Sequence, residues 1–343
     1  MTQLDDSPVT GSRPLRKAAP PGQLSGWIAL GVVWVVWGST YLAIRVGDRT
    51  LPPFTLAAVR YLVAGLVLFP LALAGARRAR RPGSSRLAQW AGPAVVGTLL
   101  LAFGNGGVCY AERTLPSGLA ALLVASVPLW MVLADWVING RRPRAGGWLA
   151  LALGLAGVAV LAQPHGHGDI LAVLVVLGAS VSWGTGSVLA GRLPAPDSPF
   201  LGSAMQMLAG GAVLTGIAAA TGELAPAEVS HVSAQSLLAL FYLIGPGSLL
   251  ALTCYVIALR RLPISTVSTY AYVNPVVAVS LGALILGEPL TGATALGGVI
   301  IVAAVALLVT SQARRPRGES PARSAVSTAP EAPRPAAEAR PAA

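Results

Sequence analysis

Charged residues are scarce in this chain. They make up 11% of its 343 residues, whereas soluble domains carry about 25%. Hydrophobic residues make up 54% of the chain, and its mean hydropathy is +0.68. This composition excludes the soluble classes and indicates a multi-pass protein of the lipid bilayer. The net charge of +11 does not indicate nucleic-acid binding, because the arginines gather in short loops and tails, as membrane topology requires.

Cysteine, histidine and catalytic motifs are equally sparse. Cys109 and Cys254 both lie in apolar stretches, which argues against a disulfide framework. The chain has no phosphate-binding Walker loop, no HExxH and no dinucleotide fingerprint. Its one metal-like cluster is His165, His167 and Asp169, which we interpret as a solvated loop. We therefore expect no enzyme activity, no cofactor, no metal and no ATP-driven motor within this chain.

Ten apolar stretches are long enough to cross a membrane, and each predicts a helix. Residues 1–24 and 313–343 are rich in small and polar residues, which predicts disordered tails. Between them we expect a first half over 25–163 and a second over 164–312. No cleavable signal precedes the first stretch. The stretches are 25–44, 54–75, 89–109, 118–138, 146–163, 170–190, 201–220, 236–259, 265–286 and 292–310.

Basic residues set the expected orientation. With the N-terminus inside, 20 of the 24 basic residues fall in segments on the cytoplasmic side. The exceptions are Arg45, Arg49 and Arg113 toward the outside, and Arg60 within the second span. The positive-inside rule then predicts that both termini are cytoplasmic.

An internal repeat organises the chain. Each half would hold five spans, an odd number, so the second half must be inverted relative to the first. Inverted repeats are typical of transporters, with the binding site between the halves. Trp37-Gly38 recurs as Trp183-Gly184 after 146 residues, and after 147 residues Leu115-Pro116 recurs as Leu262-Pro263, Pro128 as Pro275 and Gly140 as Gly287.

Five stretches carry a family resemblance: WGSTYLAIRVG (37–47), AFGNGG (102–107), AERTLPSGLAALLVASVPL (111–129), SWGTGS (182–187) and STYAYVNPVVAVSLG (268–282). Together they resemble the EamA-type transporters of the drug/metabolite transporter superfamily, and among these the bacterial inner-membrane exporters. The resemblance implies an all-α membrane protein of ten helices, built as two inverted five-helix repeats, that exports small metabolites or drugs. It also implies an acidic Gly-Glu after the fourth and ninth helices; here Gly287-Glu288 fits, but Gly140-Arg141 does not.

Residues 268–288 form the stretch around which a site is expected. Pro275 removes a backbone donor near its middle, and Tyr270, Tyr272 and Asn274 bring polar atoms to the same depth. We predict that the ninth helix breaks at Asn274–Pro275, facing a matching break at Pro128, and that these polar residues contact substrate. The alternative is that Asn274 only satisfies the carbonyl that Pro275 frees.

Few ionisable residues lie inside the spans. Arg60 is the clearest, and we expect it to pair with Glu112, either for function or as a structural ion pair. Gln206 is its uncharged counterpart in the second half. Asp135 lies near the cytoplasmic end of the fourth span, where it either reaches Arg141 or Arg142 or serves as a proton-carrying acid.

The other expected substrate contacts are polar or aromatic residues at mid-membrane depth, where they line a cavity or pack against a neighbouring helix. Glycines in 147–157 and 292–298 predict close helix packing rather than binding. The expected contacts are Trp37, Ser39, Thr40, Tyr41, Asn105, Ser126, Trp130 and Trp183.

These residues favour a carrier of a small molecule that works by alternating access. The alternatives are an intramembrane enzyme, which would need a catalytic constellation within the spans, and a channel. The expected partners are the substrate and the bilayer, with no nucleic acid. The substrate, the driving force and the choice between monomer and homodimer stay open.

Overall fold

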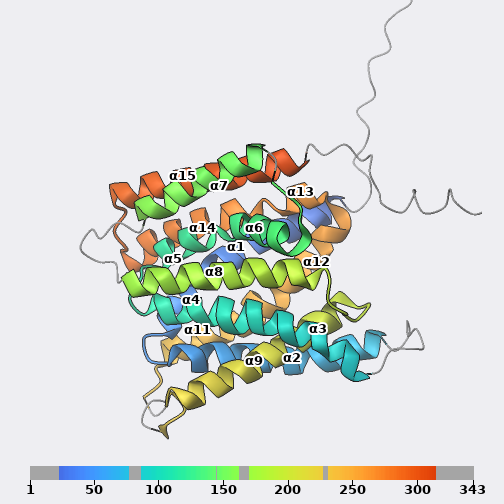
Figure 1. Cartoon of the computed structure of the whole chain (residues 1–343). Coiled ribbons are helices and arrows are strands. Elements are labelled where there is room, and N and C mark those ends of the chain that lie inside the picture. Colours follow the sequence, from blue (N-terminus) through green and yellow to red (C-terminus); the bar gives the residue numbers. More distant parts are fainter. Residues whose placement is uncertain (1–22, 77–85, 144, 162–169, 227–230, 314–343) are drawn as a thin grey trace, which may run out of the picture.

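The structure is a computed structural model that describes residues 23–76, 86–143, 145–161, 170–226 and 231–313. All regular elements within these ranges are helices, and they run side by side in one bundle (Figure 1). Eight helical spans are long and apolar enough to cross a membrane, and two more, Ala145–Leu161 and Tyr270–Leu286, are apolar but shorter. The predicted tails, 1–22 and 314–343, lie outside the described residues.

The expected all-α fold of ten spans is therefore confirmed. The first half comprises α1 (Gln23–Gly47), α2 (Pro53–Ala76), α3 (Arg86–Gly97), η1 (Thr98–Asn105), α4 (Gly106–Glu112), α5 (Ser117–Val124), α6 (Val127–Asn139) and α7 (Ala145–Leu161). The second comprises α8 (Ile170–Ala190), α9 (Pro199–Ala220), α11 (Ala234–Ile244), η2 (Gly245–Leu250), α12 (Ala251–Arg261), α13 (Ile264–Val267), α14 (Tyr270–Leu286) and α15 (Gly292–Ala313).

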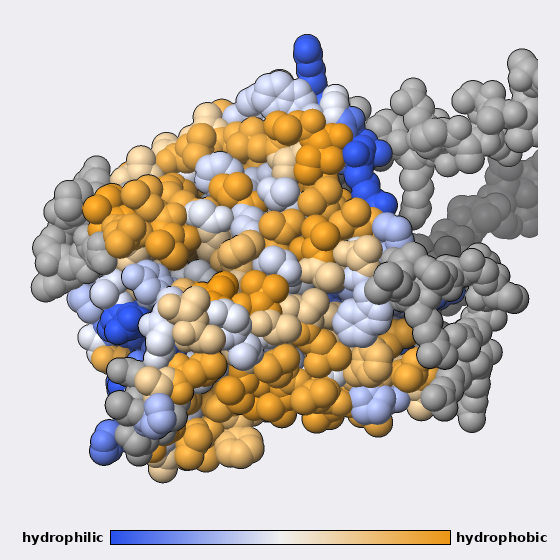
Figure 2. Space-filling model, turned by 60° about the horizontal axis from the view of Figure 1, so that its bottom comes forward, coloured by the Kyte–Doolittle hydropathy of each residue, from blue (hydrophilic) through white to orange (hydrophobic). Residues whose placement is uncertain are grey.

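The surface of the bundle suits lipid. Large apolar side chains such as Leu66, Val137 and Leu284 are exposed. Hydrophobic residues cover most of the middle of the face in Figure 2, and hydrophilic residues gather toward the helix ends. Exposing an apolar surface of this extent to water is unfavourable, so the bundle belongs in a bilayer.

The internal repeat extends to backbone irregularities. The third span changes to π-helix at Thr98 and the eighth at Gly245, 147 residues apart. Gly140 and Gly287, also 147 apart, both end their helices at φ 67°, a left-handed conformation that favours glycine. The repeat is thus present in conformation as well as in sequence.

The two halves interlock. The first helix of each half packs into the other half: α1 lies against α11, α12 and α14, and α8 lies against η1, α4, α5 and α6. Repeat-related spans also pair with each other: α2 with α9, α7 with α15, and the fourth span with the ninth through α5 and α14. Any site at the centre is therefore built from both halves.

Glycines allow the closest of these approaches. A Cβ on Gly157 would lie 3.1 Å from the carbonyl oxygen of Gly297, and one on Gly297 would lie 3.0 Å from that of Gly157. This seam between α7 and α15 agrees with the close packing predicted from their glycines.

The predicted helix breaks are only half right. The fourth span breaks at Ala125–Ser126, and Pro128 lies in the first turn of α6, as expected. The ninth span breaks instead at Ser268–Thr269, and α14 continues through Pro275. The prediction of a break at Asn274–Pro275 is wrong. A proline inside a helix removes one hydrogen bond, and neighbouring helices hold the chain helical despite that loss.

Candidate functional site

Arg60 lies at the centre of a polar site between the two halves. It is on α2 and only 5% exposed. Its Nε donates to the hydroxyl of Ser248 at 3.0 Å, and its Nη1 donates to Oδ1 of Asn105 at 3.4 Å. Ser248 belongs to η2 and Asn105 ends η1. The intramembrane guanidinium is thus held by the two π-helical segments, one from each repeat.

The π-helical geometry explains why these segments can hold a polar group. A π turn is a rare irregularity that occurs mostly at functional sites, because it leaves backbone groups outside the regular ladder. The Ser248 hydroxyl donates to the carbonyl of Leu243, five residues earlier, at 2.9 Å and accepts from Arg60. The irregular backbone and the buried charge therefore satisfy each other.

The expected pair between Arg60 and Glu112 is not formed. Among the described residues the structure places no ion pair between them, and Arg60 bonds to Ser248 and Asn105 instead. Glu112 is fully buried at the end of α4, and neither of its carboxylate oxygens has a hydrogen-bond partner. Its backbone carbonyl accepts a hydrogen bond from Nη1 of Arg45.

Hydroxyl groups of α1 and α11 lie beside this centre. Ser39 Oγ and the Tyr242 hydroxyl share a hydrogen bond of 2.5 Å. Thr40 donates to the carbonyl of Trp37 at 2.6 Å. A Cβ on Gly247 would lie 3.2 Å from Thr40 and 3.7 Å from Nη2 of Arg60, so α1, α2 and η2 converge here.

An aromatic cluster surrounds Trp37 of α1. The Trp37 ring centroid is 5.2 Å from that of Tyr255 and 5.4 Å from that of Tyr270, and the two tyrosine centroids are 5.8 Å apart. Such edge-to-face arrangements stabilise packing and also present π faces to a ligand. Of the residues predicted in 268–288, Tyr270 belongs to this cluster, whereas Tyr272 packs with an apolar cluster around Leu122 and Val279.

Asn274 joins α14 to α1. With its amide oriented so that both polar atoms have suitable neighbours, Nδ2 donates to the carbonyl of Tyr270 at 3.3 Å and to that of Trp34 at 3.2 Å. Pro275 frees the carbonyl of Ala271, one turn before it. Asn274 bonds the carbonyls of Tyr270 and Trp34 and therefore does not satisfy the one that Pro275 frees. Its contacts in this conformation are with backbone of two helices.

The remaining expected residues fall in a second group around α6 and α8. Ser126 donates to the carbonyl of Leu123 at 2.6 Å and accepts from the Trp130 indole at 3.0 Å. Trp183 packs 3.0 Å from where a Cβ on Gly104 would lie. Gln206, the repeat counterpart of Arg60, approaches α3 so closely that a Cβ on Gly97 would lie 2.3 Å from its carbonyl oxygen. The expected lining thus divides between two groups.

Tyr41 of α1 is near charged groups of two other helices. Its hydroxyl lies within electrostatic reach of both Glu112 and Arg60. The Asn105 side chain, besides holding Arg60, accepts a weak hydrogen bond from the Cys109 thiol at 3.8 Å. Polar residues of α1, η1 and α4 therefore lie near Arg60 as well as those of η2.

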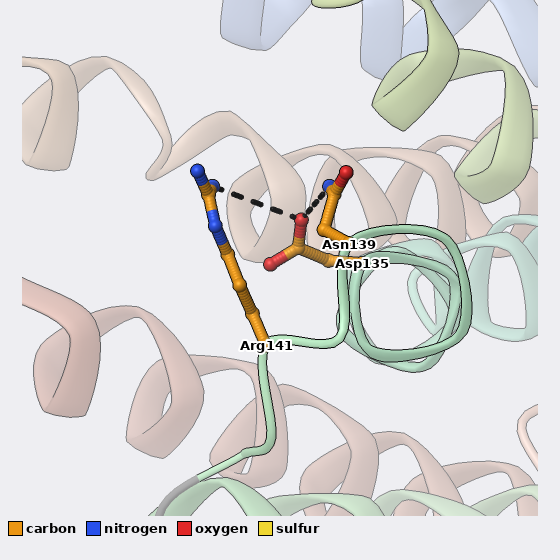
Figure 3. A network of polar contacts seen from close by, with 3 residues as sticks. All are labelled: Asp135, Asn139 and Arg141. Carbon is orange, nitrogen blue, oxygen red and sulfur yellow. Dashed lines mark hydrogen bonds and ion pairs between the residues drawn. The ribbon is translucent and has the colours of Figure 1, made fainter. Parts of the chain in front are cut away.

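Asp135 is part of a separate surface network. Its Oδ1 accepts a hydrogen bond from Asn139 and lies 3.9 Å from Nη1 of Arg141, a side chain that is 68% exposed. Both partners point toward the Asp135 carboxylate in Figure 3. The interpretation that Asp135 reaches toward Arg141 is confirmed.

A charged cavity of about 740 Å³ opens at the end of the bundle where α1, α4 and α14 finish. We call it the outer vestibule, because the orientation predicted from the basic residues would place this end outside. Sequence reasoning did not identify it, although three arginines close to span ends were a usable signal. Burial raises the pKa of the Asp48 carboxyl well above its usual value, while Arg113 and Arg45 act in the opposite direction. The charged residues that line the outer vestibule are Arg45, Asp48, Arg49, Arg113 and Glu288.

The structure brings no group of three or more metal-binding side chains together within its described part. His165, His167 and Asp169, the one metal-like cluster of the sequence, lie outside that part.

Comparison with known proteins identifies the family. The sequence pattern of the EamA-like transporter family matches residues 24–163 and again residues 170–310, once for each half. The chain belongs to this family. It is accordingly a membrane transporter and not an enzyme.

Relatives in the EamA-like family cover most of the chain. The "uncharacterized inner membrane transporter YedA" of Escherichia coli is 38% identical over 284 residues, which are 82% of this chain and 89% of that protein. A "probable amino-acid metabolite efflux pump" of Salmonella typhimurium is 29% identical, with 81% and 92% covered. A solved crystal structure of a protein, 24% identical, superposes with a TM-score of 0.56 over 87% of this chain and all of that one, which supports the fold alone.

Sequence reasoning missed several residues of the site in this EamA-like chain. Ser248 holds Arg60, Tyr242 bonds Ser39, and Tyr255 completes the aromatic cluster. All three belong to the eighth span. Polar residues inside an otherwise apolar stretch were a signal for them, but their partners come from other spans, which the sequence does not pair.

Proposed function

We propose that this chain exports a small metabolite from the bacterial cytoplasm by alternating access between its two inverted repeats. The observation that carries the proposal is the position of Arg60, buried in the bundle and held by Asn105 of η1 and Ser248 of η2. A change in the relation of the two halves must change the surroundings of this guanidinium. A charge inside a membrane span is costly and is retained for function.

The chemistry around Arg60 favours a substrate that carries a carboxylate. A guanidinium binds a carboxylate with two parallel hydrogen bonds. Hydroxyls of Ser39 and Tyr242 and the aromatic faces of Trp37, Tyr255 and Tyr270 suit a small polar molecule with an apolar part. Amino acids have these properties. Two relatives support this class by their names, the amino-acid metabolite efflux pump and, over 56% of this chain, a threonine/homoserine exporter.

Transport by purified protein in liposomes tests the proposal. Vesicles loaded with unlabelled amino acid should accumulate the same labelled amino acid by counterflow, and the rate should saturate. A channel gives neither counterflow nor saturation. If both are absent, the protein is a channel and not a carrier. Threonine and a set of amino acids with apolar side chains are suitable first probes.

Variants of Arg60 link this transport to the site. Arg60→Lys keeps a positive charge but cannot reach two partners with a planar fork, so we expect counterflow to fall at least about tenfold. Arg192→Lys is the matched control, because Arg192 is exposed after α8. If counterflow by Arg60→Lys equals that of wild type, Arg60 is not the substrate contact.

A further inference from the structure

Two carboxylates near the outer vestibule are buried without any hydrogen-bond partner. They belong to Asp48, just after α1, and Glu112, the last residue of α4. All four of their carboxylate oxygens lack both solvent contact and a donor, and Glu112 is 0% exposed. The two groups are close enough for the charge of Asp48 to act on Glu112.

The other carboxylates described at the helix ends are satisfied. Glu288 accepts three hydrogen bonds from Ser117 and Gly118, Glu223 accepts two from Thr55, and Asp135 has Asn139 and Arg141. The state of Asp48 and Glu112 is therefore a specific feature of this place rather than a general property of the chain.

Charged neighbours do not neutralise the pair by contact. Arg45 contacts Glu112, but its guanidinium bonds the backbone carbonyl of Glu112 instead of a carboxylate. The other cations that act on the pair are Arg60 of α2 and Arg113 of the turn after α4. The remaining titratable groups that face it are the carboxyls of Glu223 and Glu288, the Tyr41 hydroxyl and the Cys109 thiol.

A carboxylate that is buried without donors is costly as an anion, and binding a proton removes most of that cost. Two carboxylates near each other share this tendency, because the charge of one disfavours the charge of the other. A cation such as sodium would need several oxygen ligands, and the guanidinium of Arg45 beside the pair repels it. The chemistry of this place therefore suits a proton.

The pair lies between the outer vestibule and the site. Asp48 and Arg45 line the outer vestibule. Glu112 lies behind them, on the side toward Arg60, whose charge acts on the Glu112 carboxyl without an ion pair. The two carboxyls thus lie between the outer surface and the proposed substrate contact.

We propose that Asp48 and Glu112 bind a proton taken from the outer face, and that this proton lets the outer end of the bundle adopt the conformation described here. The proton forms an O–H bond to a carboxylate oxygen and leaves from the same oxygen when the pair is again exposed to water. The inference rests on the proposed function, because a proton bound at the outer end can control export only in a carrier that must close this end again in every cycle.

Infrared spectroscopy of the purified full-length protein, without substrate, tests proton binding directly. At neutral pH we expect the carbonyl band of protonated carboxyl groups, with the small shift in D₂O that an exchangeable proton gives. Glu112→Gln and Asp48→Asn should each lose part of this band, and Asp135→Asn at the other end should keep all of it. A band that is absent, or unchanged in both variants, overturns the inference.

Thermal unfolding of the same variants shows whether a lost infrared band reflects a lost proton site or a misfolded protein. Gln and Asn resemble the protonated acids, so both variants should unfold at temperatures within a few degrees of wild type. A large loss of stability would mean that the anionic forms are needed, and would overturn the inference. Sodium that raises the melting temperature of wild type at fixed pH, but not that of Glu112→Gln, would identify a sodium site instead and would also overturn it.

Liposome transport separates this inference from the proposed function. External acid should accelerate threonine release by wild type, by up to about tenfold for one pH unit, and Glu112→Gln should lose this acceleration. Acceleration that persists in Glu112→Gln overturns the inference and leaves the carrier intact. If wild type transports no amino acid, the proposed function fails, while the infrared band still decides whether the pair binds a proton.

Discussion

Glu288 links the C-terminal end of α14 to the first turn of α5 through Ser117. Its Oε1 accepts from the Ser117 N–H at 2.8 Å, and its Oε2 accepts from the Ser117 hydroxyl at 3.0 Å and from the Gly118 N–H at 3.1 Å. A carboxylate at a helix N-terminus satisfies free N–H groups and the positive end of the helix dipole. The contact joins the fourth span to the ninth, its counterpart in the repeat, across the two halves.

The repeat counterpart of this contact, which would be made by the residue after Gly140, cannot form in the same way. Arg141 occupies the position that matches Glu288, and it is exposed and lies near Asp135. A guanidinium donates hydrogen bonds and cannot satisfy the N–H groups of a helix start. The substitution that departs from the family pattern therefore makes the two ends of the bundle unequal.

Removing the contact at Glu288 should destabilise the protein. Glu288→Ala is expected to lower the free energy of unfolding by about 1–2 kcal/mol, the usual cost of a lost helix cap. Gly282→Ala should act through the same contact, because its Cβ would lie 2.4 Å from Oε2 of Glu288. In thermal unfolding the double variant should lose less than the sum of both single changes. Full additivity would contradict the shared cause.

Stability should also depend on pH through Asp48. Burial raises the pKa of this carboxyl in the folded protein, so the folded state holds a proton at pH values where the unfolded state has released it. The contribution is fully present below the unfolded pKa of about 3.9 and is lost as the pH rises toward the folded value.

Melting temperatures between about pH 4 and pH 8 measure this dependence. We expect the decline with rising pH to be shallower in Asp48→Asn than in wild type, whereas Asp135→Asn should keep the slope of wild type. An equal slope in Asp48→Asn and wild type would show that Asp48 does not contribute.

Much of the fold could be predicted because its signals are local or periodic. Long apolar stretches gave the spans, and the 147-residue offset between Gly140 and Gly287 gave the repeat. The interlocking of the halves could not be predicted, because an apolar helix face carries no information about which other apolar face it meets. The π-helical segments around Asn105 and Ser248 were missed for a related reason: their sequence resembles any other apolar stretch.

The site was predicted in part. Polar residues in spans correctly drew attention to Arg60 and Asn105, which the structure joins. The expectation that Arg60 pairs with Glu112 was wrong because opposite charge was the only available criterion, whereas neutral donors and acceptors on η1 and η2 lie nearer. The break placed at Pro275 was wrong because a single proline does not decide whether a packed helix continues.

The corrected surroundings of Arg60 change the expected outcome of a double substitution. Arg60→Ala should destabilise the protein by about 1.5–3 kcal/mol for each hydrogen bond to a charged group that it removes. Adding Glu112→Gln should not restore this stability, because the two side chains form no ion pair, and their effects should add within about 0.5 kcal/mol. Rescue by Glu112→Gln in thermal unfolding would restore the ion-pair hypothesis.

The orientation of the chain is open to a direct measurement. With 20 of 24 basic residues on one side, we predict that both termini are cytoplasmic. Reporter fusions after Arg86 and after Arg144 should be active as cytoplasmic reporters, and fusions after His167 should report the outside. An outside signal after Arg144 would reverse the orientation, and with it the assignment of the vestibule to the outer face.

A variant of Asn274 on α14 distinguishes a substrate contact from a structural contact. Its amide bonds the carbonyls of Tyr270 and Trp34, so Asn274→Ala leaves two buried acceptors with one donor fewer. We expect the free energy of unfolding to fall by about 1–3 kcal/mol, while the folded fraction binds threonine as wild type does. Asn139→Ala, at the cytoplasmic end of α6, is the control for loss of an amide outside the site. Melting temperature and threonine affinity measured on the same preparation distinguish the two roles: a variant that melts like wild type but binds threonine more weakly would return Asn274 to the substrate site.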